Sequence, residues 1–170
     1  MESTVIALIG ALIGIILTNG IKLILDLRTR AERVRDIQTA LRAEIRSHLR
    51  SLDAFRDDER RRETIALILG EAGYSPFVPS EIAPFVFDAM VDEIHILPGR
   101  VIDPVVLYYR QWRALAASIE DMRAAAFAAL SQPRKAAVYE DYIGIGVYAA
   151  ELANDAIEAV TRSLRDRENP

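Results

Sequence analysis

The chain of 170 residues has no cysteine, and only two of its 21 basic residues are lysines, Lys22 and Lys135. Without cysteine there are no disulfides and no thiol chemistry, and the sequence gives no redox indication of its compartment. The shortage of lysine points to genome composition rather than to a special use of guanidinium groups. Also missing are a G-x-x-x-x-G-K-[ST] phosphate loop, an H-E-x-x-H zinc motif and a nucleophile elbow. No cofactor is expected, and the sequence favours a protein without enzymatic activity over an enzyme.

Alternating strand patterns with hairpin turns are absent as well, which predicts an all-α fold. From residue 29 onward apolar positions recur three and four residues apart, as in a long amphipathic helix. The charged cluster at residues 57–63 predicts a polar turn or an exposed helix end. Asp103 is the expected N-cap of a later helix, with Pro104 at its first helical position. The expected later helices are residues 64–69, 82–94, 103–130 and 134–165, and the expected loops are residues 74–79, 95–99 and 131–133.

Residues 3–21 form an uncharged and mostly aliphatic run of nineteen, and the rest of the chain has no comparable segment. At about 1.5 Å per helical residue this run nearly matches the ~30 Å hydrocarbon core of a bilayer. A cleaved signal would have a positive start and a small-x-small cleavage site, and here Glu2 precedes the run and no such site follows it. A buried helix of a soluble protein is the other alternative. The favoured interpretation is a single transmembrane helix.

The charges that flank this run predict its orientation. Basic residues crowd the C-terminal side, whereas the N-terminal side offers only the α-amino group and Glu2. By the positive-inside rule the following domain lies in the cytoplasm, on the inner face of a bacterial cytoplasmic membrane. The residues expected near lipid headgroups are Lys22, Arg28 and Arg30.

No Pro or Gly interrupts residues 22–55, so the membrane helix is expected to continue into the amphipathic one. Together they pack in a cytoplasmic helical bundle of three long and two short helices. The expected divisions are a transmembrane anchor at 1–27, the bundle domain at 28–165 and a frayed tail at 166–170. Residues 22–62 carry 12 basic and 8 acidic residues, and residues 63–170 carry 9 basic and 16 acidic ones. The acidic remainder makes nucleic acid an unlikely partner.

Small residues follow one side of the membrane run, and they include a G-x-x-x-G spacing. Small side chains let two helix backbones approach closely in lipid, which predicts a homo-oligomer. The alternative is that lipid covers this side. The expected interface consists of Ala7, Gly10, Ala11, Gly14 and Thr18.

His48 lies on the apolar stripe of the long amphipathic helix, with Glu44 one turn before it. Such a pair can form a hydrogen-bonded polar group within a helical core or a half-buried acid–base couple. Arg42 and His48 also have an R-x5-H spacing, which resembles the R-x4-6-H motif of HEPN ribonucleases. In that family the Arg and His act on the RNA 2′-hydroxyl and the scissile phosphate. Arg42 and His48 are thus the catalytic candidates, and Glu44 and His48 the candidates for a polar core.

The other chemistry-bearing residues have structural interpretations. Asp88, Asp92 and His95 lie on adjacent turns, but they are expected to be solvated, and no metal is expected. Gly144 and Gly146 lie inside the last helix without a preceding strand, which favours close helix packing over phosphate binding. Nine aromatic residues at helical spacing are expected to pack a core rather than bind a ligand. They are Phe85, Phe87, Tyr108, Tyr109, Trp112, Phe127, Tyr139, Tyr142 and Tyr148.

After the N-terminal run the chain contains LRAEIRSH at 41–48, PFVF at 84–87, ILP at 96–98 and VVLYY at 105–109. This order resembles a broad group of small bacterial proteins with an N-terminal membrane helix and a helical cytoplasmic domain. It is also similar to the membrane-anchored accessory proteins of type VI-B CRISPR systems. That resemblance implies an oligomeric pore that strengthens antiviral defence, and a divergent HEPN-type motif whose only counterpart here is Arg42 and His48. A signalling scaffold, a membrane-tethered ribonuclease and an inactive adaptor that docks a cytoplasmic protein remain alternatives.

Overall fold

The computed structural model describes the backbone of residues 2–78 and 85–168 and the side chains of residues 27–78 and 85–166. Every regular element in these ranges is a helix, which confirms the expected all-α class. The chain divides into two compact units, Met1–Ile37 and Gln38–Pro170.

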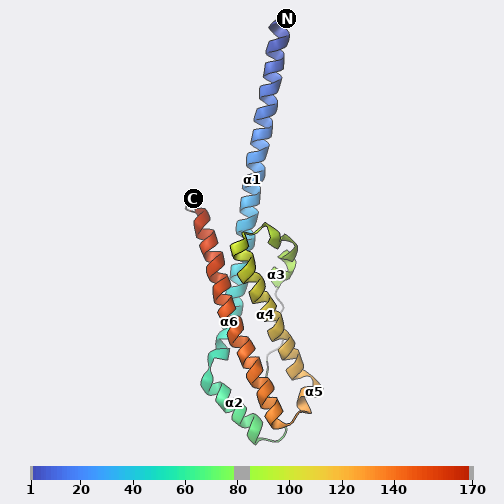
Figure 1. Ribbon diagram of the computed structural model, residues 1–170, viewed down its shortest axis with the longest axis vertical. Helices are drawn as coiled ribbons and strands as arrows, with labels where there is room; N and C mark the ends of the chain where they lie inside the picture. Colours follow the sequence, from blue (N-terminus) through green and yellow to red (C-terminus); the bar gives the residue numbers. More distant parts are fainter. Residues whose placement is uncertain (1, 79–84, 169–170) are drawn as a thin grey trace. The chain divides into compact units, whose positions relative to one another are not determined.

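Helix α1 (Glu2–Leu52) begins in the first unit and ends in the second. It has no break, so the expected anchor and the amphipathic segment belong to one continuous helix, as the absence of Pro and Gly from residues 22–55 predicts (Figure 1). The side chains of residues 3–21 lie outside the described part of the chain. Among the residues that are described, no helix is long and apolar enough to cross a membrane.

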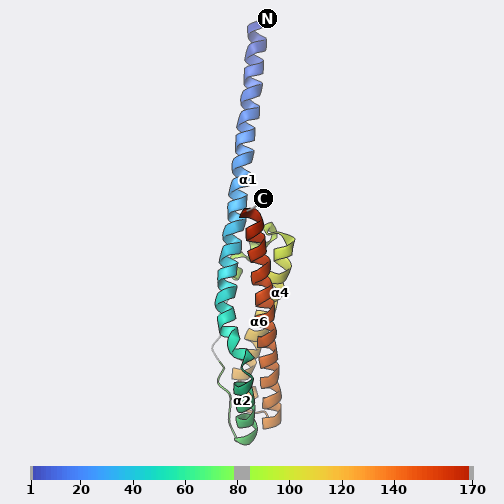
Figure 2. The same ribbon diagram turned by 90° about the vertical axis from the view of Figure 1, so that its left-hand side faces the viewer.

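The second unit is built on two long antiparallel helices, α4 (Gly99–Arg123) and α6 (Gln132–Glu168). They lie side by side in Figures 1 and 2, with the short helix α5 (Ala125–Ala128) between them in the chain. Arg100 at the start of α4 pairs with Asp166 at the end of α6 at 2.7 Å. Near mid-length, the amide of Gln111 donates to the carbonyl of Ile145 at 3.2 Å. Fully buried alanines on α6 leave little side-chain volume between it and its neighbours: Ala149, Ala150, Ala153 and Ala156.

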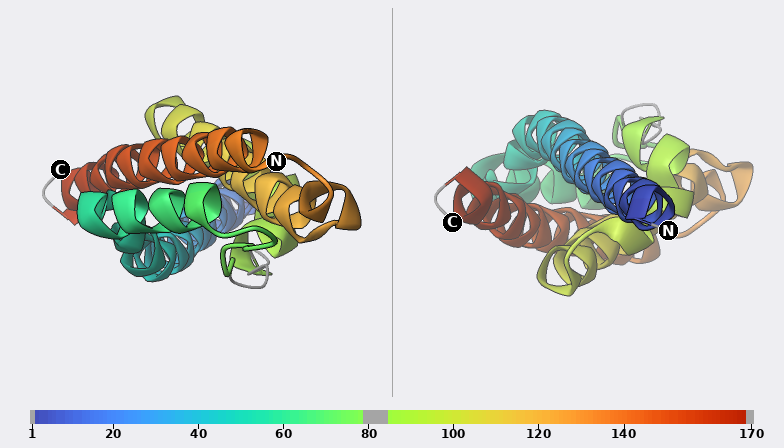
Figure 3. Two further views of the ribbon diagram at one scale, coloured as in Figure 1. Left: turned by 90° about the horizontal axis from the view of Figure 1, so that it is seen from below. Right: turned by 90° about the horizontal axis from the view of Figure 1, so that it is seen from above.

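Four shorter elements complete the second unit around the end of α1. The 3-10 turn η1 (Asp53–Arg56) and helix α2 (Asp58–Gly70) pack on α6, and α2 lies beside α6 in the view from below (Figure 3, left). Helix α3 (Phe85–Met90) leads directly into the 3-10 segment η2 (Val91–Ile96), where one short helix was expected at 82–94. Residues 82–84 of that expectation, and Pro79 of the loop expected at 74–79, lie outside the described residues.

The charged cluster at residues 57–63, expected to be a polar turn or an exposed helix end, is the exposed start of α2, which confirms the second of these expectations. The carboxylate of Asp57 accepts from the backbone N–H of Arg60 at 3.0 Å, and this N-cap starts the helix at Asp58 rather than at residue 64. Asp58 then pairs with Arg61 one turn later at 3.1 Å. Oppositely charged residues three positions apart support a helix, so a charge cluster by itself does not indicate a turn.

The expected start of the fourth helix at Asp103 is wrong, because α4 begins at Gly99 and Pro104 lies inside it. The N–H groups of Val101 and Ile102 bond to the carbonyl of Pro98, which closes the first turn ahead of Pro104. Val101 and Val105 are both fully buried. The apolar repeat therefore extends one turn before Pro104, and the burial of Val101 outweighs the hydrogen bond that Pro104 cannot make.

The end of α4 and both ends of α6 also differ from expectation. The helix expected to reach residue 130 ends at Arg123, and an extended Ala124 separates it from α5. Gln132 and Pro133, expected in a turn, form the first turn of α6, where a proline loses no hydrogen bond. At its end α6 continues to Glu168, so residues 166–168 are helical rather than a frayed tail.

Candidate functional site: a polar cluster on α1

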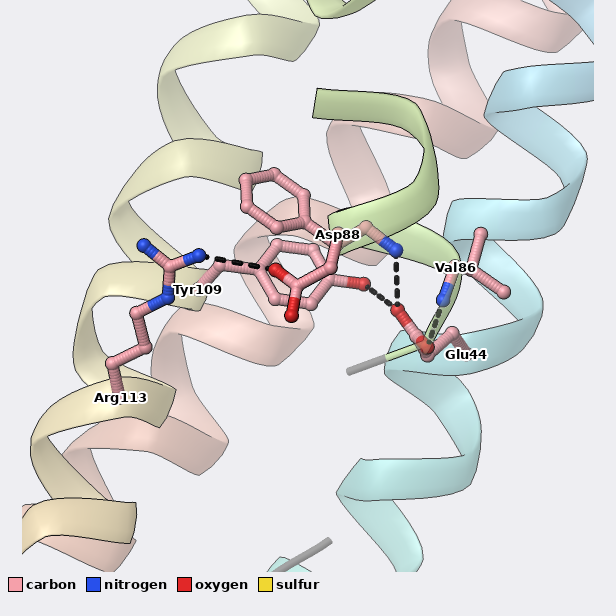
Figure 4. A network of polar contacts seen from close by, with 6 residues as sticks. Glu44, Val86, Asp88, Tyr109 and Arg113 are labelled. Atoms are coloured by element: carbon pink, nitrogen blue, oxygen red, sulfur yellow. Dashed lines mark hydrogen bonds and ion pairs between the residues drawn. The ribbon is translucent and has the colours of Figure 1, made fainter. Parts of the chain in front are cut away.

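Glu44 accepts hydrogen bonds from two other elements of the second unit (Figure 4). One carboxylate oxygen accepts from the backbone N–H of Val86 at 2.7 Å, and the other accepts from that of Phe87 at 3.2 Å. These N–H groups belong to the first turn of α3 and have no partner within their own helix. The second oxygen also accepts the hydroxyl proton of Tyr109, on α4, at 2.5 Å. One carboxylate thus joins α1, α3 and α4.

A second layer of contacts fixes α3 against α4. The ring of Phe87 stacks on that of Tyr109, with centroids 3.9 Å apart and planes 17° apart. Arg113, one turn after Tyr109, pairs with Asp88 at 3.0 Å, and its guanidinium lies 6.0 Å from the centre of the Phe87 ring. The exposed ion pair contributes little by itself, so the stacked rings supply most of the packing energy here.

His48 lies one turn beyond Glu44 and is buried against α4. Its ring stacks on Trp112, with centroids 4.0 Å apart and planes 8° apart. Its Nδ1 lies 2.8 Å from the hydroxyl oxygen of Tyr108. Only 5% of His48 is exposed, and Tyr108 is fully buried. The expectation of a hydrogen-bonded histidine in a helical core matches this geometry.

Burial controls the protonation of this cluster. It lowers the pKa of His48, and the nearby Glu44 carboxylate opposes that shift only in part. Burial also raises the pKa of Tyr108 and Tyr109, and the same carboxylate adds to both shifts. At neutral pH His48 is therefore neutral and both phenols are protonated. Tyr109 donates to Glu44, and Tyr108 shares a hydrogen bond with Nδ1 of His48.

The cluster does not bring the two catalytic candidates together. Six residues along an α-helix correspond to a rotation of about 240° beyond one full turn, so Arg42 and His48 project from different sides of α1. A general base must reach its substrate, and the buried and stacked ring of His48 does not reach solvent. The geometry gives Glu44 and His48 a role in holding the helices together.

The other site residues are separate from this cluster. The interface expected at Ala7, Gly10, Ala11, Gly14 and Thr18, together with Lys22, lies outside the residues whose side chains are described. Arg28 and Arg30 are exposed on α1. Asp88 pairs with Arg113 rather than facing His95, whose Nδ1 lies 2.8 Å from the carbonyl of Asp92. No group of three metal-ligating side chains occurs in the described part of the chain.

The aromatic and glycine expectations hold for most of the residues named. Of the nine aromatic residues, seven are buried, whereas Phe85 and Tyr148 are exposed by 77% and 50%. Gly146 packs against the ring of Phe55, and a Cβ at this position would overlap that ring. Gly144 meets nothing that a Cβ would touch. Close packing therefore applies to Gly146 alone.

Sequence reasoning missed a second buried polar pair, formed by Gln38 and Ser163. The amide nitrogen of Gln38 donates to the hydroxyl of Ser163 at 3.0 Å, and both side chains are fully buried. The amide oxygen of Gln38 has no partner among the described residues. Gln38 lies three residues before Leu41 and seven before Ile45, so the period of the apolar stripe could have indicated its burial.

In comparisons with protein-family models, with characterised proteins and with solved structures, nothing matches this chain.

Proposed function

We propose that residues 3–21 hold the protein in the cytoplasmic membrane and that the protein self-associates through this segment. Residues 28–165 then form a helical domain in the cytoplasm. The observation that carries the proposal is the place of the uncharged run on α1. The helix that supplies Leu41, Ile45 and Leu52 to the core of the second unit begins at Glu2 and includes the run. Nineteen uncharged residues on a continuous helix have the length that a bilayer requires.

The charges beyond the run support the same orientation. Arg28 and Arg30 are exposed and follow the run by less than three helical turns. Each basic residue close to an anionic bilayer surface contributes about 1 kcal/mol to binding. An exposed Arg pair at this place suits lipid headgroups on the cytoplasmic side.

The assembly that we propose is an oligomeric pore or signalling scaffold in bacterial antiviral defence. The pore and defence parts rest on the resemblance to the accessory proteins of type VI-B CRISPR systems. The oligomer rests on the Gly10 and Gly14 spacing. A buried and uncharged His48 favours this scaffold over the ribonuclease alternative. A ribonuclease needs a base that reaches its substrate, whereas a scaffold needs only stable helix packing.

Exposed aromatic residues favour an adaptor as the second candidate function. Phe77 and Phe85 are exposed by 91% and 77%, and large exposed apolar side chains are common where a protein partner docks. An adaptor of this kind would dock a cytoplasmic protein and need no activity of its own. It differs from the first proposal in being monomeric in the membrane.

Membrane attachment is tested by fractionation. The full chain and a chain lacking residues 1–27 are expressed in bacteria, and the membranes are washed with alkaline carbonate. The full chain should remain in the membrane pellet, and the shortened chain should be released. If both are released, residues 3–21 do not span the bilayer and the proposal fails.

The ribonuclease alternative is tested on the same material. RNA should remain intact with the wild-type protein and with His48→Ala alike. Cleavage by the wild type that is lost in a folded His48→Ala variant would establish the alternative instead.

A further inference from the structure

A cavity of about 430 Å³ opens in the second unit where η1, α2, the loop after α2 and α6 meet. This volume lies within the range of small-molecule binding sites in proteins. It is separate from the Glu44 and His48 cluster, and nothing in the proposed membrane function uses it.

One wall of the cavity is aromatic and tightly packed. The rings of Phe55 and Tyr142 meet edge to face, with centroids 5.0 Å apart, and Tyr139 lies 6.0 Å from Tyr142. Gly146 lets the Phe55 ring lie directly on the backbone of α6. The loop after α2 adds Tyr74 and Phe77 to the lining. Aromatic rings on several sides suit a planar ring as ligand, since offset and edge-on ring pairs are both favourable.

Two phenol groups in this wall are available as hydrogen-bond donors. Tyr139 and Tyr142 are exposed by only 7% and 5%, and their hydroxyls have no hydrogen-bond partner within the described residues. Burial, with a smaller contribution from Tyr139, raises the pKa of Tyr142 to about 12, so its hydroxyl keeps its proton and can donate. Each hydroxyl can therefore donate to a ligand oxygen that enters the cavity.

The charge of the residues that line the cavity favours a ligand with a negative charge. Arg60 lines the cavity, and its guanidinium has no carboxylate partner in the part of the chain that the structure describes. No Asp or Glu occurs among the described lining residues. An aromatic cage for a cationic ligand would need the opposite arrangement, because an unpaired guanidinium repels a second cation.

We propose that this cavity binds a small molecule that combines a planar aromatic ring with an anionic group. The ring packs among Phe55, Tyr139 and Tyr142, and the anion meets the guanidinium of Arg60. A phosphate and a carboxylate both satisfy this chemistry, as in a mononucleotide or an aromatic acid.

The test is isothermal titration calorimetry on the full chain in mild detergent. The two probes are adenosine monophosphate and indole-3-carboxylate. The fragment ligands for comparison are adenosine and inorganic phosphate for the first probe, and indole for the second. At least one of the two probes should bind, and its fragments should bind at least tenfold more weakly. The tighter probe identifies phosphate or carboxylate as the anion. Failure of both probes to bind would overturn the proposal. A fragment that binds as tightly as its parent probe would also overturn it.

Matched variants locate the binding site. Arg60→Gln should weaken binding of the probe roughly tenfold, the effect expected from losing one charge-assisted hydrogen bond. Arg62→Gln is the control, since Arg62 is exposed on the same helix and does not line the cavity. Tyr142→Phe keeps the ring and should weaken binding several-fold with little change in the unfolding temperature. Equal affinities for Arg60→Gln and Arg62→Gln would overturn the proposed site.

Discussion

Tyr109 on α4 donates its hydroxyl proton to Glu44 on α1, 65 residues away in the sequence, with the two oxygens 2.5 Å apart. The same carboxylate accepts the N–H groups of Val86 and Phe87 at the start of α3. Three elements that are distant in the chain therefore depend on one side chain. Its removal should affect stability more than its position on a helix surface suggests.

Replacing Glu44 by Ala should lower the free energy of unfolding by about 2–4 kcal/mol, because three donors lose their acceptor together. Glu44→Gln should cost less, since its amide oxygen can still accept. Urea denaturation followed by circular dichroism measures both. Glu140→Ala, at an exposed position on α6, is the control and should change stability by less than about 0.5 kcal/mol. A loss for Glu44→Ala no larger than the control would contradict the three-element role of Glu44.

His48 should make stability depend on pH above the range where carboxylates titrate. Its folded pKa is lowered by burial, so as the pH falls below about 6.5 the unfolded chain binds a proton that the folded chain does not. The free energy of unfolding should therefore fall between pH 7.5 and 5.5. His48→Asn should remove this slope and still offer Tyr108 a hydrogen-bond partner.

His95 is the matched control, as it is the only other histidine and is exposed. His95→Asn should leave the slope unchanged. A slope that survives His48→Asn and disappears in His95→Asn would show that burial of His48 is not its cause.

Two glycines on α6 should respond in opposite directions to the same substitution. Gly146→Ala places a methyl group against the ring of Phe55 and should cost about 1–3 kcal/mol. Gly144→Ala meets open space and should raise stability by about 0.5–1 kcal/mol through helix propensity. Thermal unfolding of the two variants gives the comparison, and a stabilising Gly146→Ala would refute the close contact.

The buried pair of Gln38 and Ser163 should show strong coupling. Ser163→Ala leaves the Gln38 amide without its acceptor and should cost about 1–3 kcal/mol. The double variant Gln38→Leu with Ser163→Ala removes both polar partners and should recover most of that loss. A double-mutant cycle from urea denaturation measures the coupling, and simple additivity would mean that the bond contributes nothing.

The sequence predicts the helices better than their ends. Spacings of three and four from Val34 to Leu52 predict the amphipathic part of α1, because burial of one face is a property of the helix itself. The start of α2 depends on the Asp57 cap, a local contact with the N–H of Arg60. The start of α4 depends on the burial of Val101, which other elements of the second unit provide. Local signals such as Pro104 were therefore outweighed by packing.

The candidate site was foreseen only in part. Glu44 and His48 were identified because both lie on one helix, one turn apart. Val86 and Tyr109 were not identified as partners of Glu44, nor was Ser163 identified as the partner of Gln38. No sequence pattern states which residue 42 to 125 positions away will lie opposite. The cavity beside Phe55 was missed for the same reason, because three separate segments line it.

The central claim is that the N-terminal segment assembles the protein in the membrane. The most direct measurement is the mass of the full chain in mild detergent by light scattering, beside Gly10→Leu with Gly14→Leu and the control Ile13→Leu. The account predicts a discrete oligomer for the wild type and the control, and a smaller species for the double variant. A monomeric wild type would contradict it.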